Sequence, residues 1–378
     1  MNRAGQYITA LGGIAGYKAY RPNPLPPFPE IEMDAEMVAL LSKAHNFLGK
    51  LDMTSELIPD MNLFLSAYVR KEALLSSQIE GTQATLEDVL NPNVDVAVNL
   101  EVNDVVNYVN ALNYAIVRMK ELPVCNRLLC DTHKVLMQGV RGQEKNPGEF
   151  RRSQNWIGSS NSNLQTARYV PPTVEDMQIA MSDLEKFIND YDMDILLKTA
   201  LVHYQFETVH PFLDGNGRIG RLLILLYLME QGLLKEPVIY VSYFLKKNQV
   251  EYYDRISEVR RSGNYEQWVK FFLEAVDSAA SDAVESIEKL SKLHEKNIAL
   301  LPKPKRKKDN LRMLFDYLEK HPIIDIKHTS ETLKISYNTT STAVKTLVEL
   351  GILRETTNAA RNRVFSYEAY LEILRNGT

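Results

Sequence analysis

Residues 210–221 read HPFLDGNGRIGR, which combines a histidine, a carboxylate, an amide, three glycines and two arginines. A structural core does not need that mixture. The apolar run that follows, residues 219–228, is typical of a buried helix, so the first two glycines lie where a loop passes into a helix N-terminus. The stretch therefore predicts a site at a loop-to-helix junction.

The residue types in this stretch suit a polyphosphate. Gly215 and Gly217 free the backbone to turn consecutive N–H groups toward an anion, and the helix N-terminus behind them favours phosphate. Arg218 and Arg221 lie three positions apart, on one face of the first helical turn, and can fork onto further phosphate oxygens.

The remaining polar residues suit proton transfer and metal binding. Asp214 offers one hard oxygen ligand, which suits Mg²⁺ shared with nucleotide phosphates. His210 is the side chain best suited to accept a proton near neutral pH. A histidine before proline, taken alone, is usually a turn residue. The whole set in this order indicates a nucleotide site with a base beside it.

The stretch resembles the Fic signature, His-x-Phe-x-[Asp/Glu]-Gly-Asn-Gly-Arg-x-x-Arg, at every defined position. Fic proteins are mostly adenylyltransferases that move AMP from ATP onto a hydroxyl group of a target protein. The resemblance implies that His210 deprotonates a Ser, Thr or Tyr hydroxyl and that Asp214 holds Mg²⁺ against the phosphates. The implied phosphate contacts are Gly215, Asn216, Gly217, Arg218 and Arg221. The intact Gly-Asn-Gly-Arg favours AMP transfer over the phosphotransferase branch of the family.

A second segment, residues 76–81, reads SSQIEG and resembles the Fic inhibitory motif, [Ser/Thr]-x-x-x-Glu-[Gly/Asn]. Ser76 and Glu80 hold its defining places. Its position upstream of the signature fits the class whose inhibitory helix precedes the Fic core. The resemblance implies that Glu80 pairs with Arg221 and removes the cation that should orient the γ-phosphate.

Two further segments resemble parts of a Fic site. Residues 148–158 and 168–172 form two strand-like arms around a polar tip, which predicts a hairpin. In Fic proteins this flap positions a target segment by strand addition, and the expected contacts are Ile157, Gly158, Tyr169 and Val170. In residues 242–253, we expect contacts to adenosine from Asn248 and from Tyr252 or Tyr253. The alternatives are a plain surface hairpin and an amphipathic helix with an aromatic face.

Composition places the chain among ordinary soluble proteins. It has 378 residues, a net charge of −4 and two cysteines, Cys125 and Cys130, which form no ligand pattern. No run of 18 apolar residues occurs, and the N-terminus lacks the apolar segment of a signal peptide. We expect a cytoplasmic protein with no membrane partner.

Helical periodicity dominates from about residue 34 to residue 300, after a Gly- and Pro-rich arm. We therefore expect a mainly α protein, with a helical Fic core and a small β-hairpin flap. The expected division is an N-terminal arm and helical region carrying the inhibitory motif (1–100), the Fic core (101–300), a linker (301–308) and a C-terminal domain (309–378).

The C-terminal part differs in charge, because residues 303–378 carry 14 Lys and Arg against 9 Asp and Glu. Three short helices followed by two strand-like arms resemble a winged helix-turn-helix domain, which often follows the Fic core in bacterial relatives. Residues 337–341 and Lys345 would form the recognition helix, with Arg361 and Arg363 on the wing. The partner is DNA or a protein, since the recognition helix has few cations.

Together these patterns predict a nucleotidyltransferase of the Fic type that uses ATP and Mg²⁺. We expect it to modify a target protein, itself included, and to be autoinhibited by Glu80. One alternative is a DNA-binding regulator whose Fic core senses nucleotide. Another is removal of AMP from a modified target by the same site, with Glu80 orienting a water. The motifs name neither the target nor the trigger, and they leave the oligomeric state, a homodimer included, open.

Overall fold

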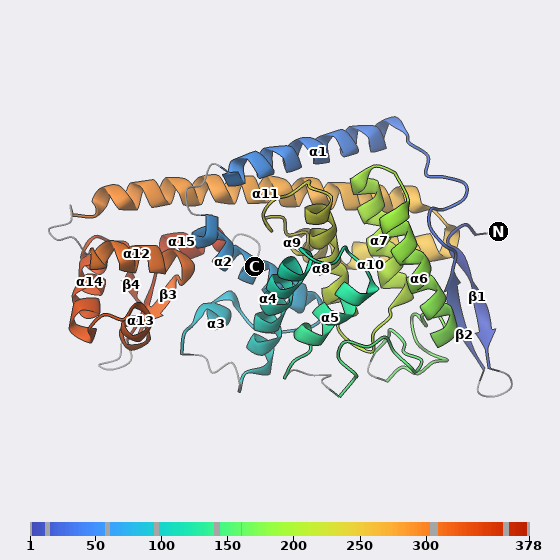
Figure 1. The fold of residues 1–378 in the computed structure, drawn as a ribbon, viewed down its shortest axis with the longest axis horizontal. Coiled ribbons are helices and arrows are strands. Elements are labelled where there is room, and N and C mark those ends of the chain that lie inside the picture. Colours follow the sequence, from blue (N-terminus) through green and yellow to red (C-terminus); the bar gives the residue numbers. More distant parts are fainter. Residues whose placement is uncertain are drawn as a thin grey trace.

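The structure is a computed structural model and describes residues 2–11, 16–56, 61–93, 98–139, 144–159, 161–302, 309–357 and 363–375. Most of these residues are helical, which confirms the mainly α prediction. Figure 1 shows an elongated molecule, with a long helix along most of its length and a group of short helices and strands at one end.

Two helices form the centre of the core, α7 (Ile195–Val209) and α8 (Asn216–Glu230), and they pack against each other. Residues 196–209 and 216–228 are buried almost without interruption. Helices that are covered on all sides belong in the middle of a protein. The loop that joins them, residues 210–215, is therefore held at the centre of the molecule. Neighbouring helices are α4 (Leu100–Arg118), α5 (Asn126–Leu136) and α6 (Val174–Asp190).

A second layer is built on α11 (Tyr265–Leu300), whose 36 residues span about 54 Å at 1.5 Å per residue. Helix α1 (Ala35–Glu56) runs beside it (Figure 1). The remaining helices of this body are α2 (Met61–Ile79), α3 (Leu86–Leu90), α9 (Ser242–Lys247) and α10 (Gln249–Ser262). Helix α2 contacts α4, α8 and α9, so the segment with the inhibitory motif is part of the body.

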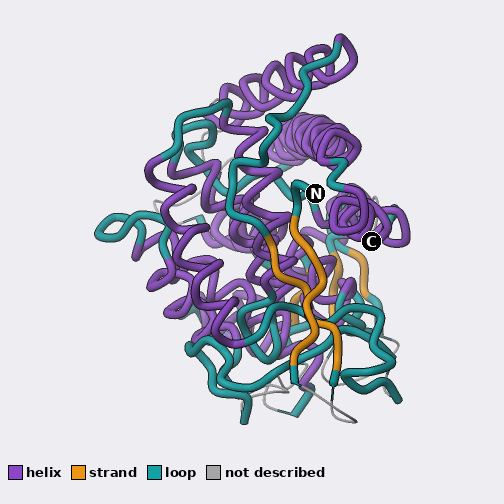
Figure 2. Tube along the Cα trace, turned by 90° about the vertical axis from the view of Figure 1, so that its right-hand side faces the viewer, coloured by secondary structure: helices purple, strands orange, loops and turns teal. Residues whose placement is uncertain are grey.

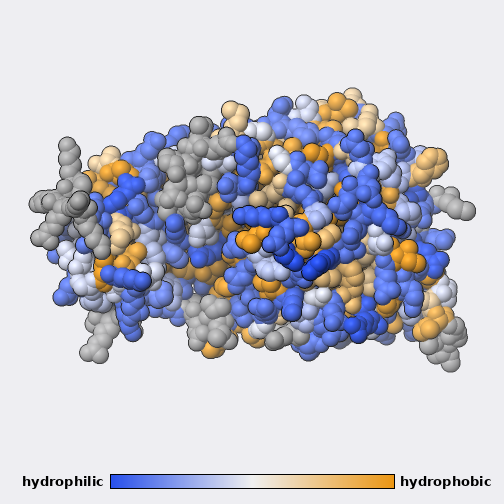
Figure 3. All heavy atoms as spheres, viewed as in Figure 1, coloured by the Kyte–Doolittle hydropathy of each residue, from blue (hydrophilic) through white to orange (hydrophobic). Residues whose placement is uncertain are grey.

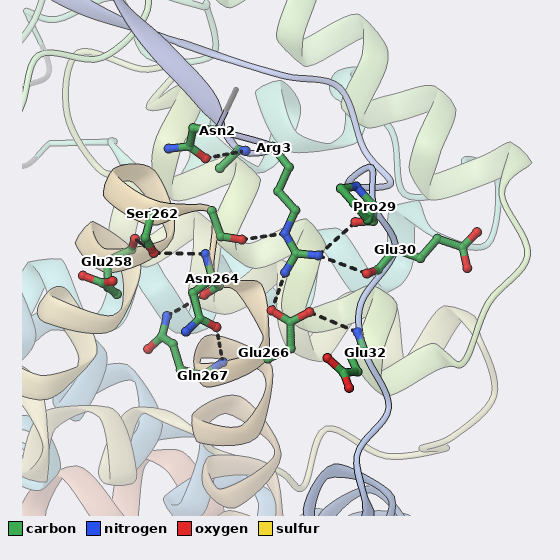
Figure 4. Close-up of polar contacts among 12 residues, drawn as sticks. Asn2, Arg3, Pro29, Glu30, Glu32, Glu258, Ser262, Asn264, Glu266 and Gln267 are labelled. Atoms are coloured by element: carbon green, nitrogen blue, oxygen red, sulfur yellow. Dashed lines mark hydrogen bonds and ion pairs between the residues drawn. The ribbon is translucent and has the colours of Figure 1, made fainter.

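The N-terminal arm contains a hairpin that the sequence pattern did not predict. Strands β1 (Gly5–Ala10) and β2 (Tyr17–Pro22) pair antiparallel and lie at the end of the molecule opposite the C-terminal unit (Figures 1 and 2). Arg3 anchors the arm, because it donates to the carbonyls of Gly263, Pro29 and Glu30 and pairs with Glu266 (Figure 4).

The C-terminal unit is a compact group of short elements. It contains α12 (Asn310–Lys320), β3 (Ile323–Asp325), α13 (Ile326–Leu333), α14 (Tyr337–Glu349), β4 (Arg354–Glu355), β5 (Val364–Ser366) and α15 (Glu368–Leu374). The three strands form one antiparallel sheet in the order β3-β5-β4. The winged-helix assignment stays a prediction, and residues 303–308 of the expected linker and Arg361 lie outside the described residues.

The surface is mixed in character. Figure 3 shows hydrophilic and hydrophobic residues interspersed over one face. Within the described ranges, no helix is both long enough and apolar enough to cross a membrane.

Gly220 tests how tightly α7 and α8 pack. A Cβ at this position would lie 2.3 Å from Glu207 Oε1 and 3.2 Å from the Phe206 ring. We expect Gly220→Ala to lower the free energy of unfolding by about 1–3 kcal/mol, as overpacking of a core does. Gly49, within α1, has nothing within 4 Å of the same added atom. Gly49→Ala should raise the free energy of unfolding by about 0.5–1 kcal/mol. Urea titration measures the free energy of unfolding of both variants, and equal changes would contradict the tight packing around Gly220.

Candidate active site

The loop between α7 and α8 is held in shape by its own residues. Helix α7 ends at His210, whose backbone is left-handed (φ 51°), and α8 begins after Gly215, which is also left-handed (φ 74°). Asn216 closes the turn, since its Oδ1 accepts the Phe212 N–H at 2.8 Å and its amide donates to the Phe212 carbonyl at 2.8 Å. Both ends of the Asn216 amide are therefore occupied by the loop itself, so this side chain braces the site.

Three residues outside the signature support the same loop. The buried Arg151 donates from Nε to the His210 carbonyl at 3.0 Å. Asn155 donates to the His210 carbonyl at 3.3 Å and to the Phe212 carbonyl at 2.9 Å. The His133 ring stacks on Phe212, with centroids 3.8 Å apart. Sequence reasoning missed all three, because they are distant in the chain and carry no motif.

His210 faces a cavity of about 400 Å³. Within the described part of the chain, its buried Nδ1 has no hydrogen-bond partner. Burial lowers the pKa of His210 to about 4; the Glu80 carboxylate opposes this effect, and Arg260 and Arg151 add to it. At neutral pH the ring is therefore uncharged and able to accept a proton.

Titration by NMR tests the environment of His210. Since its pKa is lowered to about 4, its ring proton signals should not move between pH 8 and pH 5.5. His294 should titrate above 6.5, because Nδ1 lies 2.8 Å from the Glu319 carboxylate, which raises the pKa. The unfolded chain binds its proton near pH 6.5, so burial of neutral His210 costs stability as pH falls from 6.5 toward 4. A His210 midpoint near 6.5 would contradict a buried ring.

Arg221, on the first turns of α8, is buried and is held by Ser76 and Glu80. Its Nε donates to Ser76 Oγ, and its Nη2 donates to the Ser76 carbonyl and to Glu80 Oε1, each at 2.8 Å. Burial works to lower the pKa of Arg221, but nearby groups, Glu80 foremost and Glu207 among them, hold it above its ordinary value. We call these three hydrogen bonds the Arg221 contact.

The Glu80 carboxylate lies against the start of α8. A Cβ on Gly217 would be 2.1 Å from Glu80 Oε1 and 3.0 Å from Arg221 Nη1, so only glycine leaves room for it. A helix N-terminus favours an anion at this place. Glu80 follows the last residue of α2, before Gly81 (φ 100°), and is 39% exposed. A carboxylate therefore occupies a position suited to a phosphate.

Two buried carboxylates near Arg221 were not predicted. Burial raises the pKa of Glu72, on α2, and of Glu207, on α7, to about 7 in each case, and Arg221 opposes the rise. Glu72 accepts a hydrogen bond from Tyr108 at 3.3 Å. Glu207 lies in the wall of the cavity. An acid inside the apolar stretch before His210 is the signal that could have indicated Glu207.

The other two charged residues of the signature, Arg218 and Asp214, form ion pairs outside the cavity. Arg218 Nη1 pairs with Asp104 on α4 at 3.1 Å, and its Nη2 lies 3.5 Å from Met137 Sδ. Asp214 pairs with Lys145 Nζ at 3.2 Å. Neither Arg218 nor Asp214 is among the described residues that line the cavity. The structure therefore brings His210 and Glu80 together with Arg221, whereas Arg218 is paired with Asp104 of the neighbouring helix α4.

Asp214 is the candidate metal ligand. Within the described residues, no group of three or more His, Cys, Asp and Glu is placed to hold a metal ion. The Asp214 side chain is 36% exposed, so it is open to a cation that arrives with a nucleotide. Mg²⁺ usually takes one or two carboxylates and completes its shell with substrate phosphates and water. The donor set fits Mg²⁺ carried by ATP and does not fit a resident metal.

The expected flap is less regular than predicted. Its two arms meet in one antiparallel bridge, Ile157 with Tyr169, with N–O distances of 2.8 and 3.0 Å. Ile157 and Gly158 border the cavity, whereas Val170 is buried beside the N-terminal hairpin. Tyr169 is also buried and donates from its hydroxyl to the Thr208 carbonyl at 2.6 Å. Tyr169 therefore fixes the segment to α7.

Asn248 does not reach the cavity in this structure. It lies between α9 and α10, and its amide donates to the Phe244 carbonyl at 3.0 Å. Tyr252 and Tyr253, the aromatic residues predicted with it, do line the cavity. The adenosine contact expected from Asn248 stays a prediction without a geometric counterpart.

Fold and site define a helical protein in which the carboxylate of Glu80 lies against a loop-to-helix junction. Residues 38–117 match the family described as Fic/DOC family N-terminal, and residues 123–228 match the Fic/DOC family. These two ranges of the chain are therefore similar to the two domains of the Fic/DOC family.

Relatives agree with this assignment. The chain is 33% identical over 133 residues to the protein adenylyltransferase Fic of Aedes aegypti, covering 34% of this chain and 23% of that protein. It is 28% identical over 169 residues to the protein of the same name from Drosophila erecta, covering 44% and 30%. The chain thus spans about a quarter of the length of these curated relatives.

Solved structures support the fold. A Fic family protein from Desulfovibrio desulfuricans matches with a TM-score of 0.56 at 19% identity, over 89% of this chain and 97% of that chain. A Fic domain containing signalling protein from Bacteroides thetaiotaomicron matches with a TM-score of 0.51 at 17% identity, over 67% of this chain and 97% of that chain.

Proposed function

We propose that this protein is an adenylyltransferase that moves AMP from ATP to a Ser, Thr or Tyr hydroxyl of a protein, and that the Arg221 contact restrains it. The observation that carries the proposal is the cavity that His210 lines together with Arg221 and Glu80, with His210 Nδ1 unpartnered within the described residues. The curated relatives carry the name protein adenylyltransferase Fic, which supports the same reaction class.

His210 acts as the general base in this proposal. It takes the proton of the target hydroxyl, and the hydroxyl oxygen forms a bond to the α-phosphorus of ATP. The bond between the α-phosphorus and the bridging oxygen breaks, and pyrophosphate leaves. The neutral state that burial imposes on His210 keeps the ring ready to accept the proton.

The phosphates of ATP would occupy the position at the start of α8 where the Glu80 carboxylate now lies. The N–H groups at the start of α8 and the Arg221 guanidinium would donate to the phosphates. Mg²⁺, when bound with ATP, would be held by Asp214 and would neutralise phosphate charge. Once the Arg221 contact opens, Arg221 orients the outer phosphates so that the α-phosphorus faces the hydroxyl.

The target segment has a path beside the cavity. A groove of about 550 Å³ between the flap and the N-terminal hairpin shares Arg168 and Tyr169 with the cavity wall. The two spaces therefore lie on either side of the same flap residues. We assign the groove to target residues that flank the modified hydroxyl.

The test is the position of the label that reaches protein. Glu80→Gly protein is incubated with Mg²⁺ and cell lysate, with either α-labelled or γ-labelled ATP. AMP transfer places the α-label on protein and leaves the γ-label in pyrophosphate. Attachment of the γ-label would mean phosphoryl transfer and would reject the proposal.

The C-terminal unit gives little support to the DNA-binding alternative. Lys345, on α14, lies 3.8 Å from Glu349, and Arg363 lies 3.6 Å from Glu355. Two of the cations expected to meet phosphates are thus paired with carboxylates of the same unit. Neither ion pair favours DNA binding as a second function.

A further inference from the structure

A second, smaller cavity of about 140 Å³ lies between α2, the end of α3 and the C-terminal unit. Three basic side chains line it: Arg70 from α2, His321 from the end of α12, and His328 from α13. Asn91 and Tyr317 add an amide and a phenol. Every one of these five side chains can donate a hydrogen bond.

Arg70 has unused donors in this cavity. Its Nη1 donates to the Lys320 carbonyl at 3.1 Å, which caps the end of α12. Among the described residues, the ionisable groups that act on Arg70 are the phenols Tyr317 and Tyr370 and include no carboxylate. Burial lowers the pKa of Arg70. Arg70 is half-buried, and a guanidinium withdrawn from water is normally paired with an anion, so the cap explains only part of this arrangement.

The charges around His321 are of one sign. Its ring stacks on Tyr317, with centroids 4.4 Å apart. Burial lowers the pKa of His321 to about 4, and Arg70, His328 and Lys320 lower it further. Asp325 lies at the start of α13, where Oδ1 accepts the His328 N–H at 2.8 Å, but it is not among the residues lining the cavity.

We propose that this cavity is a binding site for a small oxyanion the size of phosphate. Arg70 would fork onto two of its oxygens, and His321, His328 and Tyr317 would donate to the others. The site is separate from the signature: Arg70 is six residues before Ser76 on α2, about 9 Å along the helix axis.

The anion would join two parts of the molecule. Helix α2 is already tied to the C-terminal unit, because Ser66 Oγ lies 3.5 Å from the Lys320 carbonyl. Arg375, on the C-terminal side, pairs with Glu87 of α3 at 2.7 Å. A ligand that binds this arrangement stabilises it. The same arrangement holds Glu80 on Arg221, so a bound anion would strengthen the restraint; this step rests on the proposed function.

The test uses the full-length protein and inorganic phosphate as the probe. Isothermal titration calorimetry, at constant ionic strength in chloride, compares the wild type with Arg70→Gln, Arg218→Gln and Arg375→Gln. We expect Arg70→Gln to weaken phosphate binding by roughly tenfold or more, since a charge-assisted hydrogen-bond donor is lost. Arg375→Gln, which removes a cation at the same interface but outside the cavity, should leave the affinity unchanged.

Two outcomes would overturn the proposal. One is an affinity that is unchanged in Arg70→Gln; a loss of affinity in Arg218→Gln would then place phosphate at the signature. The other is no phosphate binding by the wild type at all. Arg70→Lys guards against a misfolded variant, because it keeps the charge and should retain part of the affinity. None of these measurements depends on AMP transfer.

A second readout tests the coupling to the restraint. In the AMP transfer assay, phosphate should slow the wild type by a larger factor than Arg70→Gln. Competition with ATP at the signature would slow both proteins by the same factor and would reject the coupling while leaving the binding site intact. If neither protein transfers AMP, the proposed function fails and the calorimetric result stands.

Discussion

Glu80→Gly should raise the rate of AMP transfer by roughly 100-fold. Glu80 is 39% exposed, so its pair with the buried Arg221 belongs at the lower end of the range for buried ion pairs, about 3 kcal/mol. Each 1.4 kcal/mol corresponds to a factor of ten. The substitution frees Arg221 and the start of α8 for the phosphates. The measurement is the initial rate of α-label incorporation at saturating Mg²⁺ and ATP.

Two further variants test whether the negative charge of Glu80 causes the restraint on AMP transfer. Glu80→Gln keeps the size of the side chain and removes its charge, so most of the gain should remain. Ser76→Ala removes the Oγ–Nε bond and keeps the Ser76 carbonyl and Glu80, so the gain should be smaller, roughly three- to tenfold. If Glu80→Gln behaves like the wild type, backbone freedom at position 80 matters and the ion pair does not.

His210→Ala, made in the Glu80→Gly background, should lower the rate by roughly 100- to 10,000-fold, the usual contribution of a general base. ATP binding should persist, because His210 makes none of the anion contacts at α8. His210 has a left-handed backbone (φ 51°), which alanine adopts poorly, so His210→Asn is the matched variant that tolerates it. Activity retained by both variants at the level of the Glu80→Gly protein would exclude His210 as the base.

The helices could be predicted from sequence because their signal is local. Apolar residues recur with helical spacing through the body, and the expected helical region, which extends to residue 300, ends with α11. The N-terminal hairpin was missed because its strands are flanked by glycines and prolines, which favoured an extended arm. The flap was predicted as a hairpin because its arms look strand-like, yet the side chain of Tyr169 packs onto α7 instead.

The candidate site, too, could be predicted only where the sequence signal is local. The signature names His210 and Arg221, and the upstream motif names Glu80, since each lies within a short string of required residue types. Arg151 and Asn155 support the loop from about 55 residues away, and no short pattern connects them to it. The amide of Asn216 could not be assigned from sequence, because loop bracing and anion binding use the same side chain.

The central claim is that Glu80 and ATP phosphates compete for Arg221, and a double-mutant cycle tests it most directly. The rate of α-label incorporation is compared among the wild type, Glu80→Gly, Arg221→Ala and the double variant. We expect Glu80→Gly to raise the rate roughly 100-fold when Arg221 is present and to give no rise in the Arg221→Ala background. An equal rise in both backgrounds would show that Glu80 acts without Arg221 and would contradict the account.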